Sequence, residues 1–263
     1  MQLQRHLDEF DRAGIAVFAI SYDPVEAQAT FAEEFGITFP MLADPEHRVI
    51  EATGILNTLV RPDESVYGIP FPGTYVLGTD GRVEEKLFFQ HYRTRPSAST
   101  VLREGFGIDF EVENHPHADV EGEGVRIDAT FGGESLVFME RAMLYVDIAL
   151  DEGLHIYGQP VPEGYIATEV AVSAPEGVEV GEARYPETEP FHVEGIDEEF
   201  RTFVGDARIA VPVQRVAPNV EEIVLKVSVR YQACNDRECF LPQTRLLQVE
   251  VPVAALNRAP RRD

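Results

Sequence analysis

Residues Ile223–Tyr231 read IVLKVSVRY, and an apolar side chain occupies every second position of this stretch. A period of two is the pattern of a β-strand with one buried face and one exposed face. The same alternation recurs in residues 144–150 and 247–251, and turn clusters such as SAPEG and RYPETEP separate the runs. About seven or eight short strands without a long helix predict an all-β sandwich for the second half of the chain.

The two cysteines of the chain, Cys234 and Cys239, directly follow this strand. Pro242 precedes the next strand, so we expect both cysteines at a hairpin-like turn, with Cα atoms about 4.4 to 6.8 Å apart. Two cysteines cannot complete a four-thiolate zinc site. In the chain-entropy model, so short a loop gives about 2 kcal/mol, which makes the bridge a poor stabilising device. Residue chemistry alone supports a redox-active pair and a structural pair about equally.

The segment YQACNDRECFLP, residues 231–242, resembles the YQ-x-C…C-x-P signature of the amino-terminal domain of the DsbD family. The resemblance covers about residues 125–253 and implies an immunoglobulin-like fold whose cysteines cycle between dithiol and disulfide. It implies that Cys239 meets a protein thiol/disulfide partner, such as a thioredoxin-like protein, and that Cys234 resolves the mixed disulfide. The charged neighbours of the cysteines do not by themselves decide which sulfur is the better nucleophile.

The same resemblance implies an aromatic cap that shields the cysteines. Residues 153–157, GLHIY, look like the family's aromatic segment, which makes Tyr157 a site-shaping residue. Four residues separate the cysteines here where DsbD has five, and the cap region is longer. Two residues therefore qualify for the cap, Phe191 first and Phe200 second.

The first half alternates helical and strand patterns, which predicts an α/β architecture. We expect a helix that ends at Gly14, a strand over 15–20, helices over 24–35 and 45–52, a hairpin over 73–89 and a helix over 96–106.

Residues 31–44, FAEEFGITFPMLAD, resemble the thioredoxin-like redoxin superfamily that includes the AhpC/TSA peroxiredoxins. Residues 68–77 look like the strand entry after that fold's cis-proline, so we expect a cis bond before Pro72. Members place the attacking cysteine at the start of a helix, and Met1 falls inside that helix. We therefore expect an N-terminally truncated thioredoxin-like domain without its first strand and nucleophile.

Residues 114–124, NHPHADVEGEG, are polar and without period, which predicts a linker. The expected organisation is a thioredoxin-like domain over 1–112, a linker over 113–124, a β-sandwich over 125–256 and a tail over 257–263. His115 and His117 have no second ligand cluster at metal spacing, so we predict neither a metal site nor a cofactor.

Charge and hydropathy restrict the partners. The net charge of −24 opposes contact with nucleic acid and with anionic lipid. No apolar run reaches the roughly 20 residues of a membrane span, and the first ten residues lack the pattern of a signal peptide. The compartment stays open, because the DsbD resemblance favours an extracytoplasmic site and the lack of a signal-peptide pattern favours the cytoplasm.

These observations predict a thiol-disulfide oxidoreductase of the redoxin class with a Cys234/Cys239 couple. One alternative is a binding or scaffold module with a structural disulfide. Another is a peroxidase whose nucleophile lies upstream of Met1. The chain as written should exchange disulfides without turning over peroxide, because both thiols lie in the β half, away from a helix amino terminus.

Overall fold

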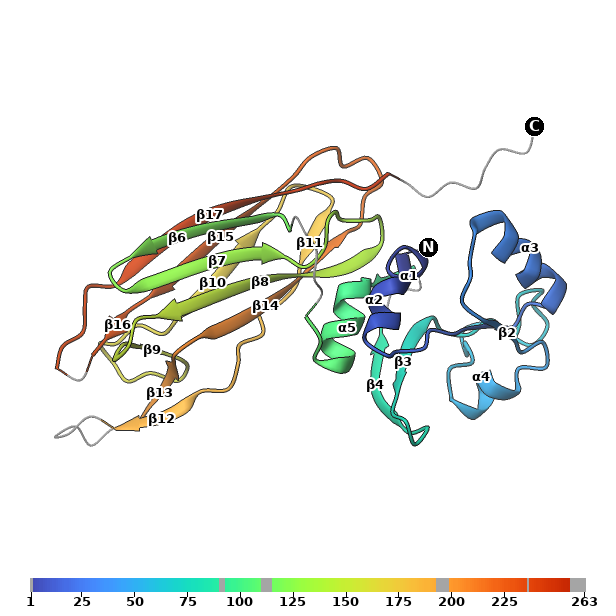
Figure 1. The fold of residues 1–263 in the computed structure, drawn as a ribbon, viewed down its shortest axis with the longest axis horizontal. Helices are drawn as coiled ribbons and strands as arrows, with labels where there is room; N and C mark the ends of the chain where they lie inside the picture. The colour runs from blue at the N-terminus through green and yellow to red at the C-terminus, as the bar shows by residue number, and fades with distance from the viewer. Residues whose placement is uncertain (1, 90–92, 110–114, 193–198, 236, 256–263) are drawn as a thin grey trace. The chain divides into compact units, whose positions relative to one another are not determined.

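The computed structural model describes residues 2–89, 93–109, 115–192, 199–235 and 237–255. The chain divides into two compact units, Met1–Phe110 and Glu111–Asp263. In Figure 1 the first unit contains helices and short strands, and the second unit consists of strands and loops.

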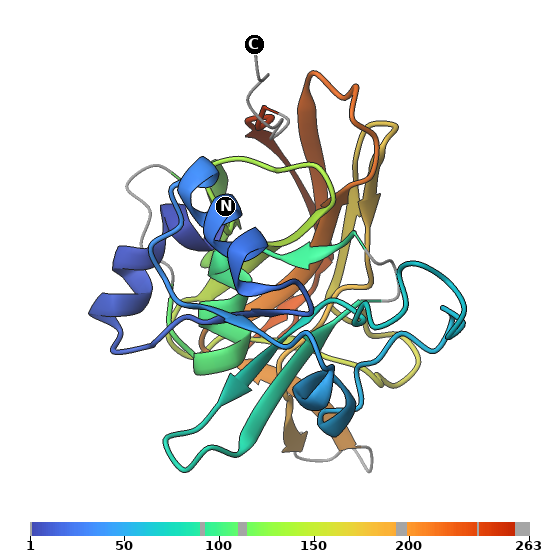
Figure 2. The same ribbon diagram turned by 90° about the vertical axis from the view of Figure 1, so that its right-hand side faces the viewer.

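The first unit is an α/β unit, as the sequence predicts. β1 and β2 pair in parallel, and β3 and β4 form an antiparallel hairpin, drawn in teal in Figure 2. The predicted first helix is divided in two, and the strand expected over 15–20 is only three residues long. The elements are α1 (Gln2–Arg5), α2 (Leu7–Arg12), β1 (Ala19–Ser21), α3 (Val25–Phe35), β2 (Met41–Ala43), α4 (Arg48–Ala52), β3 (Gly73–Leu77), β4 (Val83–Phe88), β5 (Arg95–Pro96) and α5 (Ala98–Phe106).

Helix α4 begins three residues later than the sequence pattern predicts, and Asp44 explains why. The buried carboxylate of Asp44 accepts hydrogen bonds from the backbone N–H groups of Arg48 at 2.9 Å, Val49 at 2.9 Å and Ile50 at 3.0 Å. The first N–H groups of a helix have no partner within it, and a negative charge is favourable there. Asp44 therefore fixes where α4 starts, directly after β2.

The predicted cis bond before Pro72 is wrong. Within the described ranges, the single cis peptide bond joins Gln159 and Pro160. The chain that enters β3 is extended, because the N–H of Phe71 donates to the carbonyl of Ile55 at 2.7 Å and Leu56 forms a bridge with Pro70. This segment leads directly into β3, and the trans form is the favoured state of most X-Pro bonds.

The second unit is an all-β unit with one main core. One sheet has the strand order β11-β14-β8-β7-β6, and a second has the order β10-β15-β17. Their strands are β6 (His117–Gly122), β7 (Val125–Phe131), β8 (Glu140–Leu150), β10 (Glu169–Ser173), β11 (Val178–Val180), β14 (Ala207–Arg215), β15 (Ile223–Tyr231) and β17 (Gln243–Val251). Alternate residues of both sheets share one buried hydrophobic cluster, which confirms the period-two prediction for Ile223–Tyr231.

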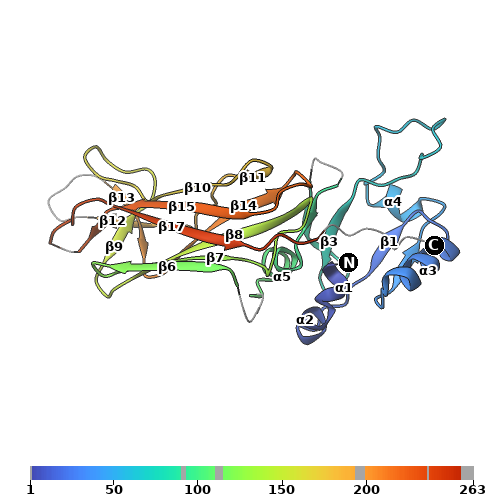
Figure 3. The same ribbon diagram turned by 90° about the horizontal axis from the view of Figure 1, so that it is seen from above.

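A smaller sheet has the order β12-β13-β9-β16, and it carries the first cysteine. Its strands are β9 (His155–Tyr157), β12 (Glu189–His192), β13 (Glu199–Val204) and β16 (Ala233–Cys234). Figures 1 and 3 show β9, β12 and β13 together at one end of the second unit.

The predicted linker over 113–124 is wrong in its second part, because β6 occupies His117–Gly122 and pairs with β7. The two strands join through Glu123 and Gly124, which both have positive φ angles, as a two-residue hairpin turn requires. Among the β6 side chains, the hydrophobic ones that pack against the core are Ala118 and Val120, and their neighbours His117, Asp119 and Glu121 are polar. Two alternating apolar residues are too few for the sequence pattern to predict this edge strand.

Candidate redox site

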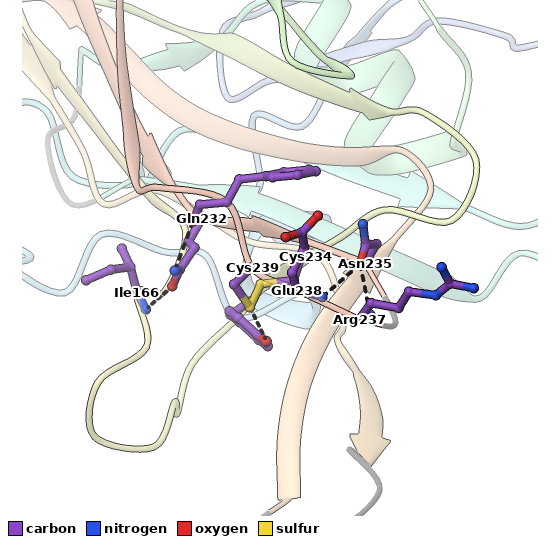
Figure 4. The surroundings of a disulfide bond; sticks show 9 residues. Ile166, Gln232, Cys234, Asn235, Arg237, Glu238 and Cys239 are labelled. Atoms are coloured by element: carbon purple, nitrogen blue, oxygen red, sulfur yellow. Dashed lines mark hydrogen bonds between the residues drawn. A yellow bond between two sulfur atoms is a disulfide. The ribbon is translucent and has the colours of Figure 1, made fainter.

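Cys234 and Cys239 form a disulfide with an S–S distance of 2.10 Å (Figure 4). Their Cα atoms are 4.0 Å apart, which is shorter than the predicted range. The two cysteines face each other across a narrow hairpin, whose flanking bonds run from Asn235 N to Glu238 O at 2.9 Å and from Phe240 N to Ala233 O at 2.8 Å. Directly opposed residues between such bonds are the closest pairs of an antiparallel ladder.

Two polar side chains hold this hairpin in place. The Oδ1 atom of Asn235 accepts hydrogen bonds from the N–H groups of Arg237 at 2.8 Å and Glu238 at 2.9 Å, inside the loop between the cysteines. The amide of Gln232 donates to the carbonyl of Phe240 at 3.1 Å and accepts from the N–H of Ile166 at 3.2 Å. Gln232 therefore ties the hairpin to the loop that follows β9, as Figure 4 shows.

The two sulfur-bearing residues differ in accessibility. Cys234 is 1% exposed, whereas Cys239 is an exposed residue. Thiol-disulfide exchange requires an incoming thiolate to reach one sulfur of the bond. Of the two cysteines, Cys239 is therefore the more accessible residue, and Cys234 is buried.

Tyr157 contacts the exposed cysteine directly. Its hydroxyl oxygen lies 3.5 Å from the Sγ atom of Cys239, and because a disulfide sulfur carries no proton, the hydroxyl is the donor. Burial, reinforced by the nearby Tyr165, raises the pKa of Tyr157 to about 12. The hydroxyl keeps its proton at neutral pH, so it can donate a hydrogen bond to a thiolate at this position.

An aromatic cluster covers Cys234. Tyr157, Phe200 and Cys234 belong to one buried group, and the ring centroids of Tyr157 and Phe200 are 5.3 Å apart. Phe191 is partly buried against this group and lies opposite Phe200 across the β12–β13 pair. The structure thus brings together Cys234, Tyr157 and both cap candidates, and the aromatic cover lies over Cys234 while Cys239 stays accessible. Pro72 belongs to the first unit and is not part of this cluster.

Sequence reasoning did not single out Tyr165 or assign a role to His155. The ring centroid of Tyr165 lies 5.3 Å from that of Tyr157 and 4.8 Å from that of Phe200. Tyr165 lies in a loop rich in proline and glycine, residues 159–165, QPVPEGY, and no sequence pattern signals that its ring packs on the cluster. His155 lies within the GLHIY segment and is the direct cross-strand partner of Cys234.

Among the residues that the structure describes, no group of three or more His, Cys, Asp or Glu side chains has the geometry to hold a metal ion. None of the described helices is long and apolar enough to cross a membrane.

Comparison with known families supports both halves of the sequence interpretation. Residues 1–86 match the model of the AhpC/TSA family, and residues 128–251 match the model of the amino-terminal region of the thiol:disulfide interchange protein DsbD. A putative peroxiredoxin of Mycobacterium tuberculosis is 36% identical over 78 residues, which are 30% of this chain and 49% of the relative. Peroxiredoxin Bcp of Escherichia coli is 29% identical over 104 residues, which are 38% of this chain and 62% of the relative.

The chain therefore spans about half, 49%, of the length of the Mycobacterium tuberculosis relative. Among solved structures, the amino-terminal periplasmic domain of ScsB from Proteus mirabilis has a TM-score of 0.41 at 14% identity and covers 53% of both chains. The reduced amino-terminal domain of DsbD from Neisseria meningitidis has a TM-score of 0.30 at 13% identity and covers 52% of this chain and 85% of that one. By the family models, the chain combines an AhpC/TSA-like segment with a segment similar to the amino-terminal domain of DsbD.

Proposed function

We propose that this chain is a thiol-disulfide oxidoreductase that passes electrons between protein dithiols through the Cys234/Cys239 couple. The observation that carries the proposal is the asymmetry of the pair, an exposed Cys239 bonded to a buried Cys234. In the proposed reaction, a partner thiolate attacks Cys239 and releases Cys234, and in the reverse direction Cys234 expels the partner. The proposed scaffold is an immunoglobulin-like sandwich, and the match to the DsbD amino-terminal model supports it.

The proposed partner is a protein, such as a thioredoxin-like protein, that presents an extended segment beside its own cysteines. The backbone hydrogen bonds of the hairpin are made by residues next to the cysteines. Within the described ranges, the backbone N–H and C=O groups of Cys239 make no hydrogen bond. Its N–H and C=O groups therefore remain available for pairing with a partner strand. Two residues further on, Leu241 is 80% exposed and offers an apolar contact beside the sulfur.

An exchange assay tests this function. The full chain, reduced beforehand, should reduce an oxidised thioredoxin-like protein, and the reaction should stop after one disulfide per chain because the sequence has two cysteines. The control is the chain with both Cys234→Ser and Cys239→Ser. A wild-type rate no higher than that of this double variant would refute the proposal and leave the alternative of a structural bridge.

Leu241→Ser should slow exchange with the protein partner by about tenfold. Burial of a leucine side chain stabilises an interface by about 1.5 to 3 kcal/mol, and the entropy cost of association offsets part of this free energy. The rate of reduction by dithiothreitol should not change, because this small dithiol needs no apolar contact. Leu246→Ser is the matched control, since Leu246 is 77% exposed on β17. Equal effects of the two substitutions would contradict a specific contact at Leu241.

The AhpC/TSA match favours peroxide reduction as a second candidate function. The matched residues 1–86 contain no cysteine, so a thiol-based peroxidase reaction has no nucleophile within them. Hydrogen peroxide consumption by the Cys234→Ser, Cys239→Ser double variant tests this candidate. Turnover in that variant would show chemistry independent of the couple.

A further inference from the structure

His155 is the residue directly opposite Cys234 in the small sheet. The two residues pair in antiparallel register between β9 and β16. Directly opposed residues direct their side chains to the same face, with Cβ atoms about 4.5 to 5.5 Å apart. His155 is 5% exposed and Cys234 is 1% exposed, so both residues are buried on the same face of the small sheet.

Aromatic rings fix the imidazole in that site. Its centroid lies 4.4 Å from the ring centroid of Phe191 and 5.5 Å from that of Tyr157. Since Tyr157 stands two residues further along β9, both side chains belong to the same face of the sheet as Cys234. The aromatic cluster at the buried cysteine therefore lies against an imidazole, a side chain that can accept or donate a proton.

The other titratable groups of the described elements around this site are less suited to take a proton from Cys234. Tyr157 and Tyr165 are phenols, and the raised pKa of Tyr157 keeps its hydroxyl protonated. Glu189 on β12 and Glu238 on the hairpin are exposed, as is Arg237, so water solvates their charges. Histidine is the residue of this group whose ordinary pKa matches the task.

We propose that His155 accepts the proton of the Cys234 thiol when Cys234 resolves a mixed disulfide at Cys239. This inference rests on the proposed function, because it assigns a group to the resolving step. A thiol is a poor nucleophile, and burial away from charges raises its pKa further. A thiol with an ordinary pKa near 8.5 is only about 3% ionised at pH 7, so a neighbouring base can accelerate the step by up to about thirtyfold.

In the direction that oxidises the couple, the resolving step converts the mixed disulfide at Cys239 into the Cys234–Cys239 disulfide. The proton of Cys234 moves to the imidazole, and the sulfur lone pair of Cys234 attacks the Sγ atom of Cys239. The Cys234–Cys239 bond forms, the bond between Cys239 and the partner sulfur breaks, and the partner leaves as a thiolate. The imidazolium then returns its proton to this thiolate or to water. The couple loses two electrons and the partner gains them.

The first experiment measures ionisation of Cys234 without any exchange reaction. In full-length Cys239→Ser, the ultraviolet absorbance of the Cys234 thiolate is followed against pH. We expect His155→Gln to move this titration to higher pH by about one unit or more, and His192→Gln, an exposed histidine on β12, to leave it unchanged. An unchanged titration in a folded His155→Gln chain would overturn the proposal, whether or not the chain exchanges disulfides.

The second experiment isolates the resolving step with 5,5′-dithiobis(2-nitrobenzoate), a small aromatic disulfide. Attack by Cys239 releases one coloured thiolate, and attack by Cys234 on the resulting mixed disulfide releases a second. We expect His155→Gln to slow the second release at pH 7 by about ten- to thirtyfold and to leave the first unchanged. Equal slowing of both phases, or of neither, would contradict the proposal.

The wild-type chain gives a test that does not depend on how the variant folds. If His155 is the base, the rate of the second release should stay nearly level from pH 8 down to about 7 and decline below the pKa range of histidine. A rate that falls tenfold per pH unit from pH 8 downward would identify an unassisted thiol and refute the role of His155. If the rate of the second release stays level in this pH range but the chain does not exchange disulfides with a protein partner, the proposed function is refuted and the role of His155 stands.

Discussion

Cys239→Ser should abolish disulfide exchange with a protein partner, because position 239 carries the sulfur that a partner can reach. Cys234 remains in that variant, but it is 1% exposed and lies beneath the aromatic cluster. Cys234→Ser should behave differently, since Cys239 still attacks a partner sulfur and this chain then has no second thiol to expel the partner. We therefore expect this variant to accumulate a covalent mixed disulfide.

Non-reducing electrophoresis and mass spectrometry distinguish these outcomes. Each variant is incubated with a thioredoxin-like protein that keeps only its attacking cysteine, activated as a mixed disulfide with 5-thio-2-nitrobenzoate. This reaction should give a mass equal to the sum of both chains, less the released nitrobenzoate thiol, for Cys234→Ser and no such product for Cys239→Ser. Alanine in place of serine serves as the control for hydroxyl effects. The reverse pattern, with trapping through Cys234, would contradict the assignment of roles.

Phe200→Ala should be the most destabilising single substitution near the site. Phe200 is 0% exposed, and its ring packs against Tyr157 and Tyr165 at centroid distances of 5.3 and 4.8 Å. Replacing a buried phenylalanine with alanine leaves a cavity and costs about 3 to 5 kcal/mol. Amide hydrogen exchange in β15 reports the free energy of opening the second unit and should show this loss.

The same substitution should also speed reduction of the Cys234–Cys239 bond by small thiols, because the cluster covers Cys234. Phe18→Ala is the control for stability, since Phe18 is exposed in the first unit and should change the free energy of unfolding by less than about 0.5 kcal/mol. Unchanged rates of reduction in Phe200→Ala would contradict a shielding role for the aromatic cluster.

The sequence predicts the β-rich second half well because strong alternation, as in Ile223–Tyr231, reflects burial of one face of each strand. Strand β6 was not predicted because its inward-facing hydrophobic residues are only Ala118 and Val120, which are partly buried. The flanking strand patterns predict the cysteine hairpin, but the narrow pairing that places the Cα atoms of Cys234 and Cys239 4.0 Å apart depends on backbone hydrogen bonds that no residue pattern specifies.

Other features of the site depend on contacts between distant segments. Cys234 is buried because β16 pairs with β9. Its partner in that pairing, His155, lies 79 positions earlier, and no local sequence pattern encodes this register. Tyr165 reaches the cluster from a loop. The expected cis bond at Pro72 came from a family likeness, and the hydrogen bond of Phe71 to Ile55 shows an extended approach to β3 instead.

The reduction potential of the Cys234–Cys239 couple tests the central claim most directly. Structural disulfides have potentials below about −300 mV, whereas couples that exchange with protein partners lie higher. Equilibration of the full chain with glutathione or dithiothreitol buffers, followed by mass spectrometry after thiol alkylation, gives the value. A redox-active couple predicts a potential above about −300 mV, and a value well below it would identify the bridge as structural and contradict this account.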